Sequence, residues 1–465
     1  LRNYTIFIMM SLNHNYQKSI LSYLVCVLLV AIILIIINPV PLMRGDLWAE
    51  DGRYYFADTF RVGFWDALKV NFLLKGYPQL LKYILGYLSI LINQFFFGDH
   101  LLYYSHISAL ISYFTYGLVF ALPILLFSSL MDRKSLYALP IICCFVAIGQ
   151  DNISVFLTFG RILNTGFLSI YLCFLLVAYR LITIDTLKFK YAIIIDFFIL
   201  ICLFTQPVNL IIVSFLYLSK IYQYFKHKIN LNSFLDLSFL SLGITSYLVL
   251  IITNGIMQSH GQSNFDDSHS FPIKPLLGKM IFNNYIGSVY SDIPTLIPIV
   301  LFMSYIFLSY YSRLLIHWYA IYVLILLPII SEIWRPGLLT KLDNSESGVY
   351  AMPTLLISLF LTCSLLSYFL KNKHSKGVNY GIWSLVVMLI LLNGIYANDN
   401  QNSAISTVTI EDSFQLAQPG KEDIAVVKFL NVDRENRMIY ELPINPEGWS
   451  MLFLKEDFEK VKSYL

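Results

Sequence analysis

Acidic side chains gather in one short polar stretch that follows the first apolar segment of the chain. Asp46, Glu50 and Asp51 fall close together there, with Trp48 among them. A carboxylate in this position can take the proton of an attacking hydroxyl. A second carboxylate nearby can raise the pKa of the first or help it hold Mg²⁺ or Mn²⁺. The indole ring offers a flat apolar face that suits a sugar ring. The stretch therefore predicts a general base, a cation site or both. The alternative is a solvated loop in which Asp46 or Asp51 caps a helix over residues 53–70.

Basic side chains that could bind a phosphate lie near or inside apolar segments. Arg161 interrupts an apolar run, and its partner is expected to be a lipid phosphate or Asp151. Lys82 lies about one turn inside another apolar segment, where we expect it to extend to the interface or to bind substrate. Arg335 lies in a polar connection that leads to Tyr350, and it could hold a phosphate near the lipid headgroups. The alternative for that connection is an interface loop with a Trp–Arg anchor.

The composition places these residues in a membrane protein. Hydrophobic residues make up 57% of the 465 residues and charged residues only 13%, whereas soluble chains carry about 25% charged residues. So few charges cannot cover a water-exposed surface of this size, which excludes a cytosolic enzyme and a disulfide-rich secreted domain. The lipid bilayer is thus a partner, and a net charge of +3 gives no reason to expect nucleic acid. The six cysteines lie in apolar runs without metal-ligand spacing, so we expect them to be buried.

Basic segments set the predicted topology. The apolar run from Ser19 to Ile37 is long enough to cross about 30 Å of hydrocarbon, and no small-residue cleavage site follows it. We therefore expect an uncleaved first helix with a cytoplasmic N-terminus. Lys and Arg favour the cytoplasmic side, which places there the basic clusters at 132–134, 188–190, 220–228 and 371–376. The outer side then receives residues 41–78, 255–292, 333–349 and everything after 397.

Two stretches leave the details of this topology open. Residues 79–131 must cross an odd number of times, once or three times, so we expect eleven or thirteen transmembrane helices in all. Residues 191–219 must form a short hairpin with Pro207 at its outer tip, because both flanks are basic. The polar residues Thr205, Gln206 and Asn209 then lie at membrane depth, where they line a cavity or break a helix.

The tail over residues 398–465 differs from the rest in its composition. It holds twelve acidic and seven basic residues, and its apolar residues recur in short groups. We expect a small extracytoplasmic α/β-like segment that packs on the outer loops, because it is too small to build much core alone. The predicted fold class is an all-α polytopic membrane protein, with residues 1–397 as the transmembrane domain and this segment at its end.

In its topology and its acidic first loop, the chain resembles the GT-C class of integral membrane glycosyltransferases. The residues that carry the resemblance are Asp46-Leu-Trp48-Ala-Glu50-Asp51-Gly52, Arg335 with Tyr350, and the turn Pro446-Glu-Gly-Trp449. Within the class it is most similar to bacterial and phage-type O-antigen glucosyltransferases. The resemblance implies a polyprenyl-phosphate sugar donor, an envelope glycan acceptor and a location in the bacterial cytoplasmic (inner) membrane. It also implies partner proteins, namely a synthase of the lipid-linked sugar and a flippase.

The class places its catalytic carboxylate in the first outer loop, where Glu50 or Asp51 stands in this chain. We expect it to deprotonate the acceptor hydroxyl in a single displacement at the anomeric carbon. Arg335, Arg161 or Lys82 would stabilise the departing polyprenyl phosphate, and the product would be a glycan modified as in serotype conversion of lipopolysaccharide. The loop has no strict DxD motif, so a requirement for Mg²⁺ or Mn²⁺ is left open.

Two other functions fit the same compartment. An O-antigen polymerase or ligase would use the same lipid carrier, but it would rely on arginines in large central loops. A flippase or transporter of lipid-linked sugars would show inverted repeats and charged residues near the bilayer midplane. The sequence has no internal repeat, and we expect its acids to lie in loops, which favours the transferase.

Overall fold

The computed structural model describes residues 12–45, 51–75, 78–98, 103–146, 159–184, 186–226, 231–253, 296–334, 348–371, 410–419, 439–444 and 449–462. The main bundle consists of α2 (Leu12–Ile37), α7 (Tyr104–Leu126), α8 (Arg133–Val146), α10 (Thr165–Ile182), α11 (Phe189–Leu203), α12 (Asn209–Lys226), α13 (Leu231–Thr253), α17 (Leu296–Ser312), α18 (Leu315–Trp334) and α20 (Gly348–Lys371). The first loop region holds α3 (Val40–Arg44), the π-helix η1 (Asp51–Asp58), α4 (Thr59–Val62), α5 (Phe64–Lys75) and α6 (Leu80–Phe97).

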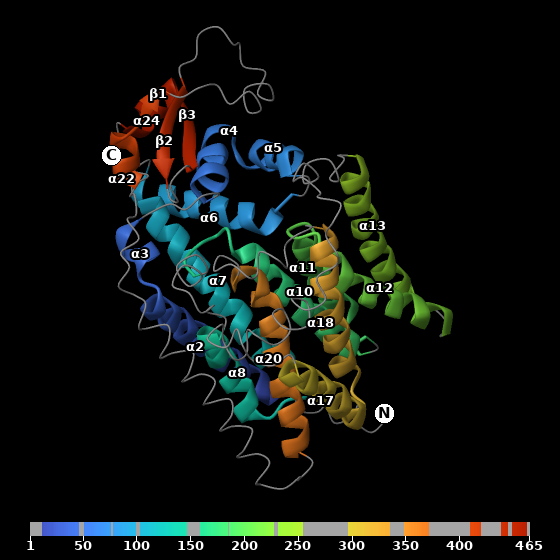
Figure 1. Cartoon of the computed structure of the whole chain (residues 1–465). Helices are drawn as coiled ribbons and strands as arrows, with labels where there is room; N and C mark the ends of the chain where they lie inside the picture. Colours follow the sequence, from blue (N-terminus) through green and yellow to red (C-terminus); the bar gives the residue numbers. More distant parts are fainter. Residues whose placement is uncertain are drawn as a thin grey trace.

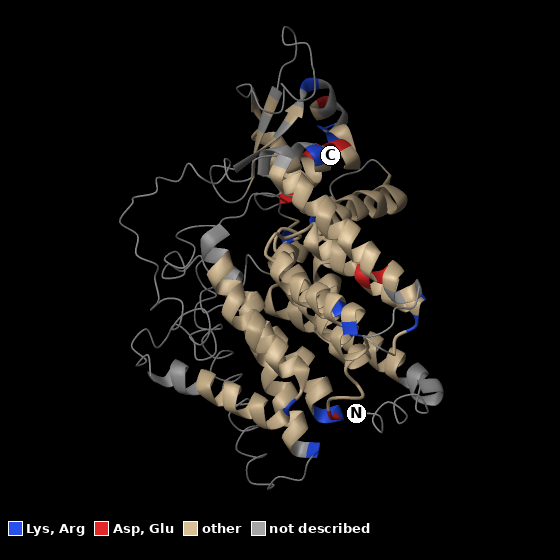
Figure 2. Ribbon diagram, turned by 90° about the vertical axis from the view of Figure 1, so that its right-hand side faces the viewer, with Lys and Arg blue, Asp and Glu red and all other residues tan. Residues whose placement is uncertain are grey.

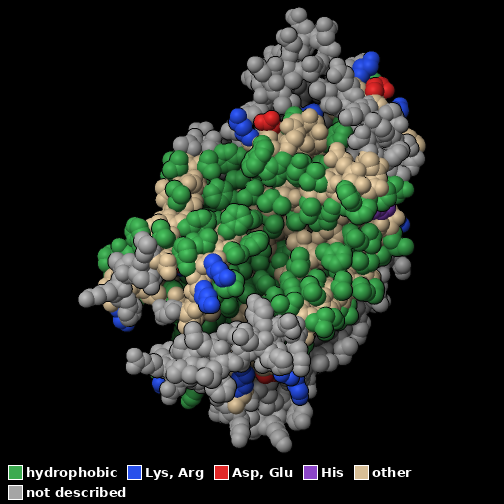
Figure 3. Space-filling model, turned by 180° about the vertical axis from the view of Figure 1, so that it is seen from behind, with side chains coloured by type: hydrophobic (Ala, Val, Ile, Leu, Met, Phe, Trp, Pro, Cys, Tyr) green, Lys and Arg blue, Asp and Glu red, His purple; other side chains and the backbone are tan. Residues whose placement is uncertain are grey.

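Long apolar helices dominate the described part of the chain. Six of them are long and apolar enough to cross a membrane: Ser19–Ile37, Leu80–Phe97, Tyr104–Leu126, Thr165–Ile182, Phe234–Ile252 and Met352–Phe369. Helices that are apolar all round are stable where lipid covers one side and protein the other. Figure 3 shows hydrophobic side chains over most of the described surface on one face of the bundle. The predicted class, a helical multi-pass membrane protein, is therefore supported.

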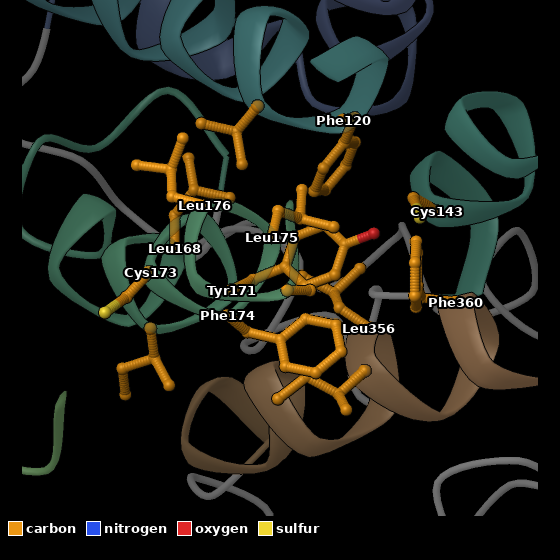
Figure 4. Close-up of a cluster of buried hydrophobic side chains, with 14 of the residues drawn as sticks. Phe120, Cys143, Leu168, Tyr171, Cys173, Phe174, Leu175, Leu176, Leu356 and Phe360 are labelled. Carbon is orange, nitrogen blue, oxygen red and sulfur yellow. The ribbon is translucent and has the colours of Figure 1, made fainter. Parts of the chain in front are cut away.

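The core of the bundle lies around α10. The ring of Phe174 stacks on Tyr319 of α18 with 5.2 Å between centroids, and it meets Phe360 of α20 edge-on at 5.4 Å. Figure 4 shows Phe174 and its α10 neighbours Tyr171 and Leu175 between α20 on one side and Phe120 of α7 on the other. Aromatic rings pack tightly here, as in the interior of soluble proteins. All six cysteines are buried and free, as expected from the sequence.

The tail forms a small sheet beside this bundle. Strands β1 (Gln418–Pro419), β2 (Ile439–Ile444) and β3 (Trp449–Leu454) pair antiparallel in the order β1-β2-β3, flanked by α22 (Ile410–Gln415) and α24 (Lys455–Lys462). Its apolar side chains join one cluster with Phe56 of η1, Ile90 of α6 and Tyr104 of α7. The described part of the tail therefore packs on the first loop region (Figure 1). We refer to this end of the bundle as the sheet end.

Two basic connections begin at the other end of the bundle. Helix α7 starts in the cluster at the sheet end and runs for 23 residues, about 35 Å. Just beyond its end, Lys371 at the end of α20 donates hydrogen bonds to the backbone oxygens of Ser129 and Leu130, at 3.2 and 2.9 Å. Two of the segments predicted on one side of the membrane, 132–134 and 371–376, thus begin at the same end.

The expected hairpin over residues 191–219 is present. Helices α11 and α12, of 15 and 18 residues, are separated by a break at residues 204–208. The side-chain amide of Asn209 donates to the Cys202 oxygen at 2.7 Å across this break. The start of α6 covers it, because the Leu81 N–H donates to Thr205 Oγ1 at 2.9 Å. The non-helical backbone is thus covered by protein, which is what its predicted position at membrane depth requires.

Helix α6 lies across the sheet end and does not cross the bundle (Figure 1). Its first residue, Leu80, donates its N–H to Phe204 at the hairpin break, at 3.2 Å. Its middle packs in the cluster with the sheet, and Phe97 near its end lies 4.4 Å from the ring of Tyr103, just before α7. Both ends of α6 therefore lie at one end of the bundle. Of the two predicted options for residues 79–131, the described helices favour a single crossing, by α7; the total number of helices remains a prediction.

Candidate functional site

A stretch of irregular backbone just before α10 is the centre of the candidate site. Residues 159–162 and Asn164 are buried and Leu163 is partly buried, and side chains of other segments bond several of their backbone groups. The Asn38 amide donates to the Phe159 oxygen at 2.9 Å, and Ser112 Oγ donates to the Arg161 oxygen at 3.1 Å. Buried backbone groups outside a helix must be paired in this way. Three elements, the end of α2, α7 and the start of α10, are held together at this point.

Gly160 allows this stretch to pass between its neighbours. Its φ is +79°, a conformation that L side chains rarely adopt. A Cβ atom at this position would lie 2.5 Å from the Tyr113 hydroxyl and 2.8 Å from Pro41. The Tyr113 hydroxyl donates to the Asn38 oxygen, so this contact cannot easily move aside. Glycine is therefore required for the turn that presents Arg161.

Asp51 reaches this stretch from the first loop. It begins η1, is 3% exposed, and accepts a hydrogen bond at Oδ1 from the Leu163 N–H at 2.6 Å. A hydrogen bond to a carboxylate is stronger than one between neutral groups, so it fixes the side chain firmly. The other predicted members of this constellation, Asp46, Trp48 and Glu50, lie outside the described residues.

The alternative prediction, one capped helix over residues 53–70, is right only in that this stretch is helical. The chain forms a π-helix and then α4, and it breaks at Gly63 before α5 begins. Gly63 has a φ of +81°, which ends the helix. Asp51 accepts a hydrogen bond from Leu163, 112 positions along the chain. A residue that only caps its own helix would accept one from the first turn of that helix.

Lys82 points into the protein and not toward the membrane interface. It is 3% exposed, and its Nζ lies 5.8 Å from the centre of the Tyr55 ring. A Cβ atom on Gly166 would lie 2.3 Å from Lys82 Cε, so the lysine crosses the first turn of α10. The expectation that Lys82 extends to the interface is therefore wrong. It assumed that α6 crosses the membrane, whereas α6 lies across the sheet end and turns this face inward.

Arg161 lies in the irregular stretch and not within a membrane-crossing helix. Its side chain is among the largest that are fully buried in the described structure, at 2% exposure. The expected ion pair with Asp151 involves a residue outside the described part of the chain. Arg335 also lies outside it, and Tyr350 lies in α20 with a side chain that is not described.

The structure thus brings together three of the predicted site residues. Asp51 contacts Leu163, Lys82 contacts Gly166, and Arg161 lies in the same stretch. One acidic and two basic side chains, all buried, thus belong to or contact the same short stretch of chain, residues 161–166, at the sheet end. In Figure 2 the ribbon carries the colours of acidic and basic residues near the junction of the sheet and the helices and at a few positions along the bundle. Two fixed cations can bind an anion such as a phosphate, and a fixed carboxylate can accept a proton.

A metal site finds no support among the described residues. No group of three or more His, Cys, Asp or Glu side chains lies close enough in these parts of the chain to hold a metal ion. The predicted ligands for Mg²⁺ or Mn²⁺ include Asp46 and Glu50, which are not described. The metal prediction therefore stays a prediction.

Tyr55 and Gln79 also lie at this site, although neither is among the residues predicted for it from the sequence. Tyr55 of η1 donates its hydroxyl hydrogen bond to Oε1 of Gln79, which lies just before α6. Gln206 Nε2 and the Lys82 side chain both lie against Gly166. A Cβ atom on Gly166 would stand 2.8 Å from Gln206 Nε2 and 2.3 Å from Lys82 Cε. Gln79 follows Pro78 at the start of an apolar segment, and this polar entry is the signal that could have found it.

A second charged group lies inside the bundle. Arg180 donates to Asp196 at 2.9 Å and to Asp236 at 2.7 Å, and Lys220 donates to both acids. The four residues come from four consecutive helices, α10 to α13. Lys220 was predicted to lie in a cytoplasmic basic cluster, and Asp196 and Asp236 had no predicted role. The expectation that acids are confined to loops is therefore wrong, and the signal was Asp196 within an apolar run.

Comparison of the chain with protein-family models, with curated proteins and with solved structures finds no significant match in any of the three. The resemblance to GT-C glycosyltransferases therefore rests on the residues and the topology. The function must be argued from the chemistry of the site at the sheet end.

Proposed function

We propose that the chain is a membrane glycosyltransferase. It moves a sugar, a hexose such as glucose, from a polyprenyl-phosphate carrier to an O-antigen or another cell-envelope glycan. The observation that supports this most is that Asp51 and Lys82 both contact the short buried stretch that carries Arg161, residues 161–166. A lipid-linked phosphate needs buried cations at the rim of the bilayer, and glycosyl transfer needs a carboxylate beside them.

The basic connections support the location of the reaction. Two of them, at 132–134 and 371–376, begin at the end of the bundle opposite the site, and Lys and Arg favour the cytoplasmic side. The sheet end then faces the outside of a bacterial cytoplasmic membrane, with the N-terminus in the cytoplasm and the C-terminal segment outside. There the prenyl tail stays in lipid while the sugar meets an acceptor in water.

The proposed mechanism is a single displacement at the anomeric carbon. A carboxylate of the first loop, Asp51 or Glu50, takes the proton of the acceptor hydroxyl as its oxygen attacks. The bond from the anomeric carbon to the phosphate oxygen breaks, and negative charge grows on the polyprenyl phosphate. Lys82 and Arg161 stabilise that charge, and their burial in a low-dielectric site strengthens the effect.

Replacing Asp51 by asparagine tests this proposal. Asparagine keeps an oxygen that accepts the Leu163 N–H bond, but it cannot take a proton, so structure and chemistry are separated. We expect transfer from labelled polyprenyl-phosphate hexose to fall by about 100-fold or more if Asp51 is the base. Glu50→Gln is made in parallel, because either acid can hold this role.

Asp66→Asn provides the matched control, because Asp66 is an exposed acid in the same loop region. It should transfer sugar at the wild-type rate. Wild-type rates in both the Asp51→Asn and the Glu50→Gln proteins would refute a general base in the first loop.

A lipid-linked sugar flippase is the second candidate, and the charged group on α10 to α13 is the observation that favours it. Ionisable residues inside apolar helices often mark transport pathways. Each acid of this group is bonded to both basic residues, however, which equally fits a structural role. Sealed vesicles containing the purified protein distinguish the two functions, since a flippase moves the lipid-linked sugar across the bilayer without cleaving it.

A further inference from the structure

Gln79 adopts a backbone conformation that its side chain does not favour. Its φ is +54°, in the left-handed region, and only Arg313 shares this property among the described residues other than glycine. The residue is also buried, at 1% exposure. Such conformations cost about 1 kcal/mol or more and gather at functional sites. Glycine or asparagine would adopt this backbone conformation at a lower cost in free energy. The presence of glutamine therefore indicates that its side chain has a function at this position.

The amide of Gln79 is only partly satisfied by the protein. Its Oε1 accepts the hydrogen bond of the Tyr55 hydroxyl. Its Nε2 is buried, and no residue in the described part of the chain accepts a hydrogen bond from it. A buried donor without an acceptor is costly, and each case in a native protein calls for an explanation. A ligand oxygen would supply the acceptor.

The surroundings of Gln79 are rich in donors. Tyr55 contacts both Gln79, through its hydroxyl, and Lys82, whose Nζ lies 5.8 Å from the ring centre. Lys82 Nζ and Gln206 Nε2 in turn lie 3.2 and 2.8 Å from where a Cβ atom of Gly166 would stand. Amide and ammonium nitrogens only donate, so this set matches a group that only accepts, such as the oxygens of a phosphate.

We propose that Gln79 is a binding residue for the phosphoryl group of the lipid-linked donor, with Nε2 donating to one of its oxygens beside Lys82. This inference rests on the proposed function and extends it to a residue and a chemical group. Tyr55 orients the amide by occupying Oε1, so that the donor end of the side chain is left for the ligand. The strained backbone is then the cost of placing that donor.

Direct binding to the full-length protein in nanodiscs tests the proposal without any turnover. The probes are polyprenyl phosphate, the neutral polyprenyl alcohol with the same tail, and inorganic phosphate as competitor. Gln79→Met removes both polar atoms at similar size, and Gln79→Glu keeps an acceptor for Tyr55 but replaces the donor by a negative charge. Gln94→Glu is the matched control, because Gln94 is exposed on α6, the helix that follows Gln79 directly. All proteins are compared as folded material from size-exclusion chromatography.

We expect Gln79→Met to bind polyprenyl phosphate about tenfold more weakly, and Gln79→Glu more weakly still, with binding of the alcohol unchanged. Gln94→Glu should bind as the wild type does. If Gln79→Met binds polyprenyl phosphate as tightly as the wild type, the role of Gln79 is refuted while the proposed function stands. A wild-type protein that does not distinguish phosphate from alcohol would defeat the proposed function itself. Full competition by inorganic phosphate at equal concentration would assign the site to free phosphate and overturn the lipid-linked ligand.

Discussion

Arg180 and Lys220 each bond the same two acids, and this sharing makes every member of the group depend on the others. Asp196 is fully buried and is bonded to both cations. A buried ion pair adds little net stability while intact, because desolvation offsets the attraction. Removing one partner is different, since it leaves a charge in the apolar interior without its counterion.

The first prediction at this scale concerns that group. We expect Asp196→Asn to lower the free energy of unfolding by about 3 kcal/mol, because two cations would then face one acid. Lys220→Met in the same protein should restore a part of the loss, since one cation and one acid would remain to pair. Unfolding in detergent, followed by circular dichroism, measures both. Losses that simply add in the double variant would show that the two residues do not interact.

Single residues also mark the limit of what the sequence can predict. The buried cysteines and the clustered acids of the first loop could be read directly, because composition and spacing carry that information. The inward direction of Lys82 could not, because it depends on how α6 lies. The bonds of Arg180 could not either, because they join residues 16 and 56 positions apart on separate helices.

At the scale of elements, the tail and the first loop form one packed unit. Phe453 of β3 is fully buried, and its ring lies 6.2 Å from Phe56 of η1 and 5.7 Å from Phe414 of α22. Phe56 in turn stacks on Tyr104 at 4.3 Å. Because Asp51 begins η1, the sheet supports the helix that carries the proposed base.

We therefore expect Phe453→Ala to loosen η1. Truncating a buried phenylalanine costs about 3–5 kcal/mol in a packed core, and here the loss falls on the contact between β3 and η1. Hydrogen exchange should become faster at residues 51–58, while α10 keeps its protection. Leu416→Ala is the control, because Leu416 is 55% exposed in the same tail. Unchanged exchange in η1 after Phe453→Ala would mean that the sheet does not support it.

Helices and their connections were predicted correctly where the sequence pattern allowed only one interpretation. The hairpin of α11 and α12 followed from two basic flanks and a central proline, and the structure has it. Helix α6 was ambiguous, because its length and hydropathy also fit a membrane span. Its contacts with the hairpin break and the sheet place it across the bundle end, and no local pattern encodes such contacts.

For the whole molecule, the prediction is the side of the membrane on which each end lies. We expect a cysteine at Leu416 to react with an impermeant maleimide added outside intact cells. A cysteine at Lys371 should react only after the membrane is opened. Both positions are exposed, and the six native cysteines are buried, so background labelling should be low. Equal labelling of both positions in intact cells would contradict the proposed orientation.

The fate of a labelled sugar in purified, reconstituted protein tests the central claim most directly. The wild-type protein is given polyprenyl-phosphate hexose, labelled in the sugar, together with an envelope glycan. We predict that the label leaves the lipid and appears on the glycan, with free polyprenyl phosphate formed in equal amount. A label that stays on its carrier while the intact lipid crosses the bilayer would contradict the transferase and establish a flippase in its place.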